Sequence, residues 1–389
     1  MKRMLVVSLM VVAMGLASSP SQGVETIFSE VTATGGKYLW STAANWDNGV
    51  PGTLDRARVG YNPASQTATI ASGTNAVAEE LIIGRQASAT DNKLIIEEGA
   101  TLTLNVDWDM LTTHTGALIN YKGINAGVVN NGGIVTITGN VMFGNKYTTT
   151  PGYYIQTAGT TTIYQGYKGE GDTHDYGNVM IALGTHPAAA IKAGGTLLDV
   201  SGGTFQQLGT NKSDLTVGAD PASIPSQGKS YIKVSNDATL ISKQHTMVAE
   251  GGVFQIDGGS ATVNLNRFAL KVYNVYDDTV VRYTGGTLEL IGNGVSTINC
   301  TGKVMFPNDG ILDVSGLTVA PGTYTVLSTT NIIDDLGLSL DAASAASGLW
   351  SIAITTGGSE HLELTYVPEP ATLALLAIGG VALLIRKRR

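Results

Sequence analysis

Acidic residues are the side chains of this sequence that come nearest to a chemical site. Glu170, Asp172 and Asp175 alternate within its most polar stretch, 167–176, where carboxylates could share a calcium ion if the chain curled back on itself. The segment 107–109 (Asp-Trp-Asp) sets an aromatic face between two carboxylates and could hold a sugar ring. A solvated loop and a corner of the fold with a half-buried tryptophan account for the same residues without a ligand, and we favour these interpretations.

Histidine and nucleophile patterns point to no further chemistry. The five histidines are scattered through the sequence, and none stands at the spacing of a zinc-binding pair. The sequence has no Gly-x-Ser-x-Gly motif, no P-loop and no dinucleotide-binding motif. We therefore predict no catalytic residue, no metal site and no cofactor, and we expect the protein not to be an enzyme.

Cys300 is the only cysteine of the chain, so no disulfide can form within it. The residue follows Ile298 and Asn299 in a strand-like run without a histidine nearby, which favours a buried and unreactive thiol. A nucleophile and a bridge to a second molecule are the alternatives. Stability must then come from packing and backbone hydrogen bonds.

Composition and charge indicate a β-rich protein. Charged residues make up 14% of the chain and aromatic residues 6%. Glycine accounts for 49 of the 389 residues, which is well above its average share of about 7%. The formal net charge is -8, and lysine is sparse outside the two ends. A protein that binds phosphate backbones needs a basic patch, so we predict no nucleic-acid partner.

Short alternating runs dominate the body of the chain. Runs such as 93–96, 134–137, 231–234 and 287–291 place apolar residues at every second position and end near Gly, Asn or Asp. This pattern predicts strands bounded by tight turns. In seven places such a run is followed by a turn and then by a second strand. These turns are at 98–99, 132–133, 158–159, 202–203, 237–238, 258–259 and 285–286.

Turns that recur at irregular intervals of roughly 20–45 residues are typical of stacked coils with loops inserted. We predict a right-handed parallel β-helix (β-solenoid) over residues 24–310, with Val, Ile and Leu inside each coil and Thr, Lys, Glu and Asn on its outer face. A pair of β-sandwiches is the alternative. The strands after 310 lack the glycine turn, so we predict a small C-terminal β cap over 311–366 that protects the last coil.

The N-terminus has the pattern of a secretory signal peptide. Lys2 and Arg3 precede an apolar segment from Leu5 to Ala17, and small or turn-forming residues follow up to Gly23. We place the signal peptide at 1–23. It predicts export of everything that follows.

The C-terminus combines an apolar run with a basic end. The run 371–385 is uninterrupted and somewhat shorter than the roughly 20 residues that cross a bilayer, but flanking residues and arginine side chains extend it. We predict a transmembrane helix here. The positive-inside rule would keep the basic end in the cytoplasm and everything before Pro368 outside. The membrane-orienting residues are Arg386, Lys387, Arg388 and Arg389.

Residues 367–389 closely resemble the PEP-CTERM sorting signal of Gram-negative bacteria that make extracellular polysaccharide. Val367-Pro368-Glu369-Pro370, the apolar run and the basic end follow one another in the order of that signal. The resemblance implies that a membrane-embedded exosortase recognises Pro368, Glu369 and Pro370, removes the helix and passes the body to the cell surface or matrix. A stiff linker before a helix that is retained is the alternative for Pro-Glu-Pro.

A second resemblance covers most of residues 38–310. Trp40, Asn45, Trp46 and Asp55, followed by the glycine repeats, look like the β-helical passenger-type proteins that often carry PEP-CTERM tails and share repeats with autotransporter adhesins. Trp40 and Trp46 could form an exposed platform for sugar stacking. We favour a cap over the first coil, which would shield its open end from aggregation.

The combined features predict an exported structural or adhesin-like surface protein that an exosortase sorts. It would be held in the membrane by its C-terminal helix before processing, and its partners would be extracellular polysaccharide or neighbouring cells. A polysaccharide lyase or glycosidase built on a β-helix and a non-catalytic glycan-binding protein are the alternatives. Clustered carboxylates with a basic residue in a cleft would favour the enzyme, whereas a flat face of Thr and Asn would favour the structural protein.

Overall fold

The computed structural model of the protein describes most of the chain between Gly23 and Pro368. The described ranges are 23–61, 65–84, 91–105, 115–119, 125–143, 152–164, 179–181, 196–209, 214–218, 229–270, 272–273, 280–283, 285–307 and 309–368. For 115–119, 180–181, 272–273 and 280–283 only the backbone is described. The predicted signal peptide up to residue 22, the segments 107–109 and 167–176, and the tail from Glu369 onward lie outside these ranges.

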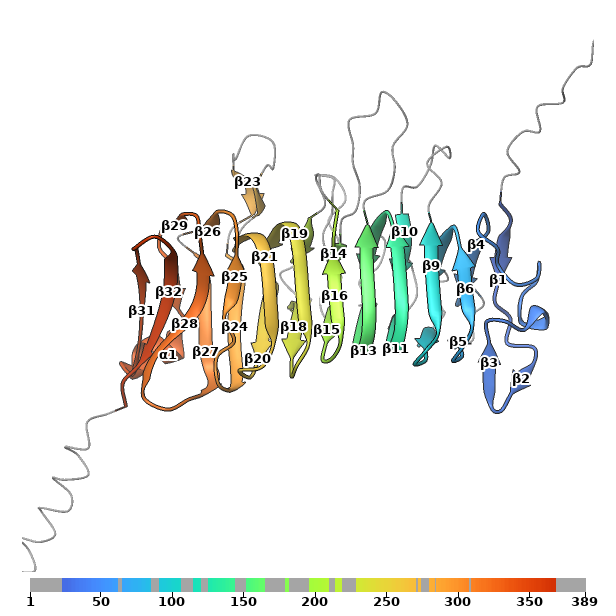
Figure 1. Cartoon of the computed structure of the whole chain (residues 1–389), viewed down its shortest axis with the longest axis horizontal. Coiled ribbons are helices and arrows are strands. Elements are labelled where there is room, and N and C mark those ends of the chain that lie inside the picture. The colour runs from blue at the N-terminus through green and yellow to red at the C-terminus, as the bar shows by residue number, and fades with distance from the viewer. Residues whose placement is uncertain are drawn as a thin grey trace, which may run out of the picture.

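The described body is all-β, as predicted, and elongated, with its first and last strands at opposite ends of the long axis (Figure 1). Within the described ranges, thirty strands join one continuous hydrogen-bonded sheet. The remaining two, β22 (Val272–Tyr273) and β23 (Val280–Tyr283), form a separate antiparallel hairpin. The helices of this part are the 3-10 turn η1 (Ala43–Asn45) and the short α1 (Ala342–Ser347).

The strands stack in three ladders, which we call A, B and C. Ladder A consists of β1 (Glu25–Ile27), β4 (Arg56–Val59), β7 (Glu80–Ile83), β10 (Thr115–Ile119), β12 (Asn140–Phe143), β14 (Val179–Ile181), β17 (Leu215–Val217), the second halves of β19 (Thr239–Val248) and β21 (Thr262–Ala269), β26 (Val304–Phe306) and β29 (Ile333–Asp335).

Ladder B consists of β3 (Lys37–Leu39), β5 (Thr67–Ile70), β8 (Lys93–Ile96), the first halves of β11 (Ala126–Thr138) and β13 (Gly152–Tyr164), β15 (Leu197–Val200), β18 (Ser230–Ser235), β20 (Gly252–Asp257), β24 (Thr287–Asn293), β27 (Ile311–Thr318) and β30 (Ser339–Leu340). Ladder C consists of β6 (Asn75–Ala78), β9 (Thr101–Asn105), the second halves of β11 and β13, β16 (Thr204–Gln207), the first halves of β19 and β21, β25 (Ile298–Cys300) and β28 (Gly322–Thr329).

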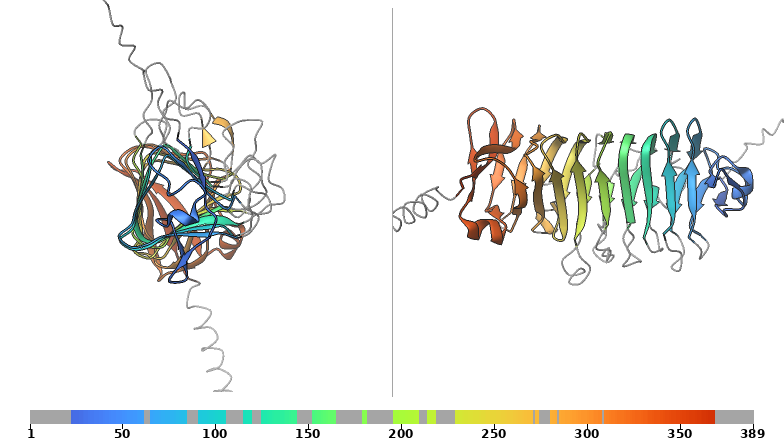
Figure 2. Two further views of the ribbon diagram at one scale, coloured as in Figure 1. Left: turned by 90° about the vertical axis from the view of Figure 1, so that its right-hand side faces the viewer. Right: turned by 90° about the horizontal axis from the view of Figure 1, so that it is seen from below.

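The chain passes through ladders B, C and A in turn and then returns to B one level further along the axis. All pairs within the three ladders are parallel from β1 to β30. One such turn takes 22 positions from Ser230 to its partner Gly252 and 44 positions from Tyr153 to its partner Leu197. Seen along the long axis, the ladders enclose a common interior (Figure 2, left). The irregular spacing of the sequence repeats therefore reflects single turns with insertions of different length.

Six of the seven predicted turns lie at one corner, where the chain leaves ladder B for ladder C. Gly203 shows why glycine is needed there. Its φ is +70°, and a Cβ atom would lie 2.1 Å from the carbonyl oxygen of Gly159 in the previous turn. In the corner of β11, the side-chain oxygen of Asn130 accepts a hydrogen bond from the Gly133 N–H at 2.8 Å. Residues with positive φ at this corner include Gly73, Gly99, Gly132, Gly159, Gly203, Asn236, Gly258, Gly292 and Gly294.

The predicted turn at 285–286 is wrong in register. Gly286 precedes β24 and lies where the chain enters ladder B. In this turn of the stack, the corner between ladders B and C is at Gly292. A Cβ on Gly286 would lie 2.0 Å from the carbonyl oxygen of Val248. Glycine is needed at both places for close packing, so a glycine pair alone does not identify the corner. The corner at Gly73, between β5 and β6, is missing from the predicted set.

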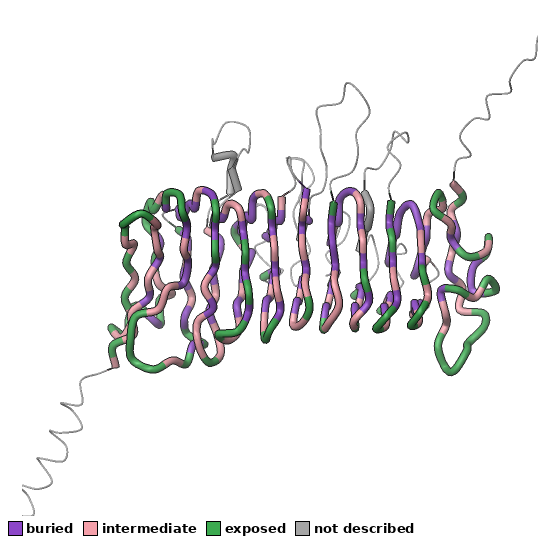
Figure 3. The backbone as a smooth tube through the Cα atoms, viewed as in Figure 1, coloured by how far each residue is buried: buried purple, intermediate pink, exposed green. Residues whose placement is uncertain are grey.

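Buried residues alternate with more exposed ones along many of the strands (Figure 3). The buried apolar side chains form one large core in the interior. Aromatic rings form edge-to-face contacts between successive turns: the ring centroids of Phe143 and Tyr154 are 6.0 Å apart, and those of Tyr154 and Phe205 are 5.8 Å apart. The hydroxyl of Tyr154 is hydrogen-bonded to Thr161 at 2.5 Å. Burial of these side chains is the main source of stability available to a chain with a single cysteine.

The outer face of ladder A departs from the predicted polar exterior. Ladder register places Thr216 beside Met247, Met247 beside Ala269 and Ala269 beside Met305. All four are buried, with 1–4% of their surface exposed, and the two methionines and Ala269 form a cluster separate from the interior core. A sheet that is buried on both faces takes apolar residues at successive positions, so the rule of polar outer residues fails here.

The N-terminal end of the stack is closed by aromatic residues. Trp40 and Trp46 are 1% and 4% exposed, and their rings meet edge to face at 4.7 Å. Trp46 donates its indole N–H to the Trp40 carbonyl at 2.7 Å, and its ring packs against Phe28 at 5.0 Å. Asn45 donates to the Leu39 carbonyl at 3.1 Å. These tryptophans are part of the core and do not form an exposed platform.

The C-terminal end is closed by an antiparallel hairpin. Strand β32 (Glu360–Tyr366) pairs antiparallel with β28 of ladder C and with β31 (Trp350–Thr355). The parallel ladders continue through β30, so pairing changes after Leu340 and not at residue 310. Sequence could not show this, because β27 and the residues up to β28 lack a Gly-Gly pair. Helix α1 precedes the hairpin and is capped by Asp341, which accepts hydrogen bonds from Ala343 and Ser344.

Candidate functional site

A histidine that faces an aspartate is the nearest approach to a catalytic arrangement in the described part of the chain. His245 Nδ1 lies 2.9 Å from Asp214 Oδ1, and an Arg267 guanidinium nitrogen lies 3.2 Å from His245 Nε2. Arginine can only donate, so Nε2 accepts from Arg267 and Nδ1 carries the proton given to Asp214. Both ring nitrogens are therefore engaged, and the three side chains connect neighbouring turns of the stack.

A second charged group lies on the outer face of ladder A near its N-terminal end. Two guanidinium nitrogens of Arg58 donate to Glu80 Oε2 at 3.2 and 3.1 Å, and Arg58 Nε lies 3.2 Å from Glu25 Oε2. The side chains of Arg58 and Glu80 are 4% and 5% exposed. Burial raises the pKa of the Glu80 carboxyl above its ordinary value, and the charge of Arg58 opposes that rise. This group is an ion pair that joins adjacent strands inside a covered face.

Sequence reasoning missed both of these charged groups. Arg56 and Arg58 alternate in β4, Glu79 directly precedes β7, and Glu80 is its first residue. The sequence feature that could have predicted the arginine–glutamate group is the presence of four charged residues in two strand-like runs. These two runs pair directly in the structure. Within the described ranges, no three His, Cys, Asp or Glu side chains lie close enough together to hold a metal ion. The acidic stretch 167–176 and the segment 107–109 lie outside these ranges.

Cys300 lies in β25 of ladder C, where it pairs with Leu265 and Thr329 and belongs to the interior core. It is 4% exposed, and burial raises the pKa of its thiol to about 12. Because the thiolate is the reactive form, a thiol that keeps its proton is a poor nucleophile. The position agrees with the prediction of a buried thiol.

We expect Cys300 to resist iodoacetamide at pH 8 in the folded protein and to react fully in denaturant, with mass spectrometry as the measurement. The thiol pKa is raised from 9.0 to about 12 on folding. The neutral thiol therefore supports the folded state fully below pH 9, and this contribution is lost as the pH rises toward 12. Rapid labelling of the folded protein at pH 8 would contradict this placement.

The C-terminal junction is where the folded body meets the predicted sorting signal. Strand β32 ends at Tyr366, and the backbone N–H of Val367 donates to the Leu349 carbonyl at 2.8 Å. The Val367 side chain is 59% exposed. Pro368, the first of the predicted recognition residues, is the last described residue. The body therefore continues to within one residue of Pro368, with no spacer between them.

Residues 367–389 match the PEP-CTERM protein-sorting motif. The match confirms the predicted signal and indicates an exported protein that an exosortase sorts to the cell surface. It begins at the residue that follows the last strand. Of the predicted recognition residues, Pro368 is described, whereas Glu369 and Pro370 lie outside the described ranges, as do Arg386, Lys387, Arg388 and Arg389.

The PEP-CTERM match is confined to the tail and assigns no family to the body of the protein. No curated protein and no solved structure matches the chain. The described ranges contain no helix with the length and apolar character needed to span a membrane. The predicted membrane helix at 371–385 lies outside them.

Proposed function

We propose that the protein is an exported, rod-shaped structural or adhesin-like component of the cell surface or matrix, delivered by an exosortase and associated with extracellular polysaccharide. The observation that carries this proposal is the PEP-CTERM motif placed directly after the last strand of an elongated body. A body that ends at the processing site can be released whole. Before processing, the C-terminal helix holds it in the membrane.

The ladder topology supports a right-handed parallel β-helix as the form of the rod. Three parallel ladders visited in a fixed order are the pattern of a chain that coils about one axis. Parallel strands joined by crossovers are right-handed in nearly all proteins. An experimental structure of the body tests the handedness directly.

The outer face of ladder C supports a structural or adhesive role over catalysis. Thr103, Thr136, Thr162 and Gln206 are register neighbours in successive turns, and Gln206 donates to the Thr162 hydroxyl at 2.8 Å. Further along, Asn264 pairs with Asn299. Rows of uncharged hydrogen-bonding side chains suit contact with a hydroxyl-rich polymer and do not provide the acid and base that glycosidic cleavage needs.

Replacing Pro368, Glu369 and Pro370 together by alanine is expected to stop sorting. In a host with an exosortase, the variant should stay in the membrane fraction with its C-terminus intact, because the enzyme no longer recognises the tail. The unaltered protein should appear at the surface without its C-terminal segment, which ends at Arg389. Mass spectrometry of the two fractions measures both outcomes, and Arg388→Lys, which keeps the charge, is the control.

Surface-extracted protein that still ends at Arg389 would contradict exosortase processing. The proposed absence of catalysis is tested separately by incubating the protein with anionic and neutral polysaccharides and measuring new reducing ends and unsaturated products. Either product would replace the structural role with that of a carbohydrate-active enzyme. A lyase gives the unsaturated product, whereas a glycosidase gives reducing ends alone.

A further inference from the structure

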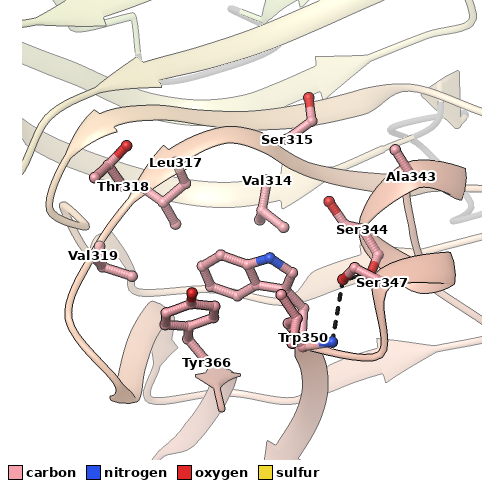
Figure 4. A pocket seen from close by; sticks show the side chains of 11 residues that line it. Val314, Ser315, Leu317, Thr318, Val319, Ala343, Ser344, Ser347, Trp350 and Tyr366 are labelled. Atoms are coloured by element: carbon pink, nitrogen blue, oxygen red, sulfur yellow. Dashed lines mark hydrogen bonds between the residues drawn. The ribbon is translucent and has the colours of Figure 1, made fainter. Parts of the chain in front are cut away.

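A pocket of about 410 Å³ lies at the C-terminal end of the body, between β27, α1 and the β31–β32 hairpin (Figure 4). This volume falls within the ~300–1,000 Å³ range of small-molecule sites. Val314, Leu317 and Ser344 are buried and line its inner part. The rim is formed in part by the exposed residues Ser315 and Ser347.

Two aromatic rings form one wall of this pocket. Trp350 and Tyr366 are register partners in the antiparallel hairpin, so their side chains project from the same face of the sheet. Their ring centroids are 4.5 Å apart, and the ring planes are tilted by 32°. Both residues are partly exposed, and Figure 4 shows the indole lying across the pocket with its nitrogen directed toward Val314. At this distance and tilt the two rings stack, so each covers one face of the other and the partly exposed pair leaves the remaining ring surface for a ligand.

Hydroxyl groups surround this aromatic surface in fixed positions. Ser347 donates to the Ser344 carbonyl at 2.7 Å and accepts from the Leu349 N–H at 3.1 Å. Ser315 donates to Asp313 Oδ1 at 2.7 Å. A hydroxyl oxygen has two acceptor positions, so the Ser347 and Ser315 oxygens can each accept a further hydrogen bond from a ligand. Thr318 contributes another hydroxyl to the rim.

Charged side chains are absent from the residues that line the pocket. An anionic ligand would lose its hydration without gaining a cationic partner. A purely apolar ligand would cover the free acceptor positions of the Ser315 and Ser347 hydroxyls and displace their water without replacing it. The pocket therefore favours a neutral molecule with one apolar face and several hydroxyl groups.

We propose that this pocket binds one neutral pyranose unit of a polysaccharide. A pyranose ring presents C–H groups on one face, which the negative face of an aromatic ring attracts, and its hydroxyls extend around the edge. Stacking on Trp350 would bring these hydroxyls toward Ser315 and Ser347. The assignment rests on the proposed function and adds to it a binding site and a ligand class.

The test uses the full-length chain in detergent and a panel of neutral gluco- and mannooligosaccharides, with uronic-acid oligosaccharides for comparison. Tryptophan fluorescence and saturation-transfer NMR measure binding. We expect a neutral oligosaccharide to bind and Trp350→Ala to weaken its affinity by about tenfold or more, as loss of a central aromatic contact does. Trp350→Phe should keep most of the affinity, because it retains a stacking face.

A second variant separates ligand binding from folding. Ala343 is exposed on α1 and lines the pocket rim, so Ala343→Trp should block the pocket without removing a core side chain. Loss of affinity in both variants, with unchanged circular dichroism for Ala343→Trp, supports the site. The same affinity in the unaltered chain and Ala343→Trp overturns it, as does the absence of binding to every neutral oligosaccharide in the panel.

The outcomes also separate this site from the proposed function. Polysaccharide binding that neither variant changes would place the contact elsewhere on the body and would overturn only the pocket. Failure of surface delivery, which cell fractionation measures, would overturn the proposed function whatever the pocket binds. Stronger binding of uronic-acid oligosaccharides than of neutral ones would overturn the ligand class.

Discussion

Replacing Gly203 by alanine is expected to lower the free energy of unfolding by about 2–5 kcal/mol. Two effects add. The left-handed backbone at φ +70° costs a residue with a Cβ about 1–2 kcal/mol. The Cβ would also stand 2.1 Å from the Gly159 carbonyl oxygen, so the two turns must move apart, and such overpacking typically costs about 1–3 kcal/mol. The neighbour is backbone and cannot rotate away.

Gly258 provides a matched control for Gly203. It lies at the same corner with a φ of +80°, but no atom lies within 4 Å of the position where its Cβ would be. Gly258→Ala should therefore cost only the backbone term, about 1–2 kcal/mol. Urea unfolding monitored by circular dichroism measures both losses. Equal losses in the two variants would show that adjacent turns are not in close contact at Gly203.

Replacing Arg58 by methionine is expected to destabilise the protein by up to about 3–5 kcal/mol at pH 7, because removing one partner of a buried ion pair leaves the other charge poorly compensated. Glu80 would keep only the more distant Arg56, whose Nε lies 3.9 Å from Glu80 Oε2. The Glu80 carboxylate would remain on a covered face, and its Oε2 would lose both guanidinium donors. Glu80→Met in the same chain should restore much of the loss. Two apolar residues of similar volume remove both charges and their desolvation together.

The loss in Arg58→Met should shrink as the pH is lowered. Burial already raises the Glu80 pKa above 4.5, and removing Arg58 removes the main opposing effect. A carboxyl with a raised pKa in the folded state favours folding fully below pH 4.5, and this contribution is lost as the pH rises through the folded-state pKa. Urea unfolding at pH 4.5 and pH 7 measures the difference. A loss that does not change with pH would show that Glu80 is not the group left unpaired.

Local sequence signals were sufficient to predict the strands and most corners. Alternation in 93–96 and 231–234 corresponds to β8 and β18, and the glycines at 132–133 and 202–203 lie at the B–C corner. These signals act through neighbouring residues, because the backbone conformation at a corner and the two faces of a strand depend on local geometry. The C-terminal motif was also readable, since its residues are contiguous.

Features that depend on contacts across turns could not be predicted. Met247 and Met305 look like ordinary strand residues, and nothing in their neighbours shows that the outer face of ladder A is buried. Trp350 begins β31 and Tyr366 ends β32, and only antiparallel pairing places them side by side. Asp214 and His245 meet because two successive turns stack. Period-two alternation identifies the two faces of a strand but not what covers each face.

The direction of the backbone hydrogen bonds has a mechanical consequence for a rod held at one tip. The ladders run along the long axis, with β1 at one end and the hairpin beside the sorting motif at the other (Figure 1). Tension between the tips acts parallel to the bonds that join neighbouring turns. An end turn has a neighbour on one side only, so it unfolds first and its residues become extended. Under load, such a rod lengthens stepwise while the turns behind it stay folded.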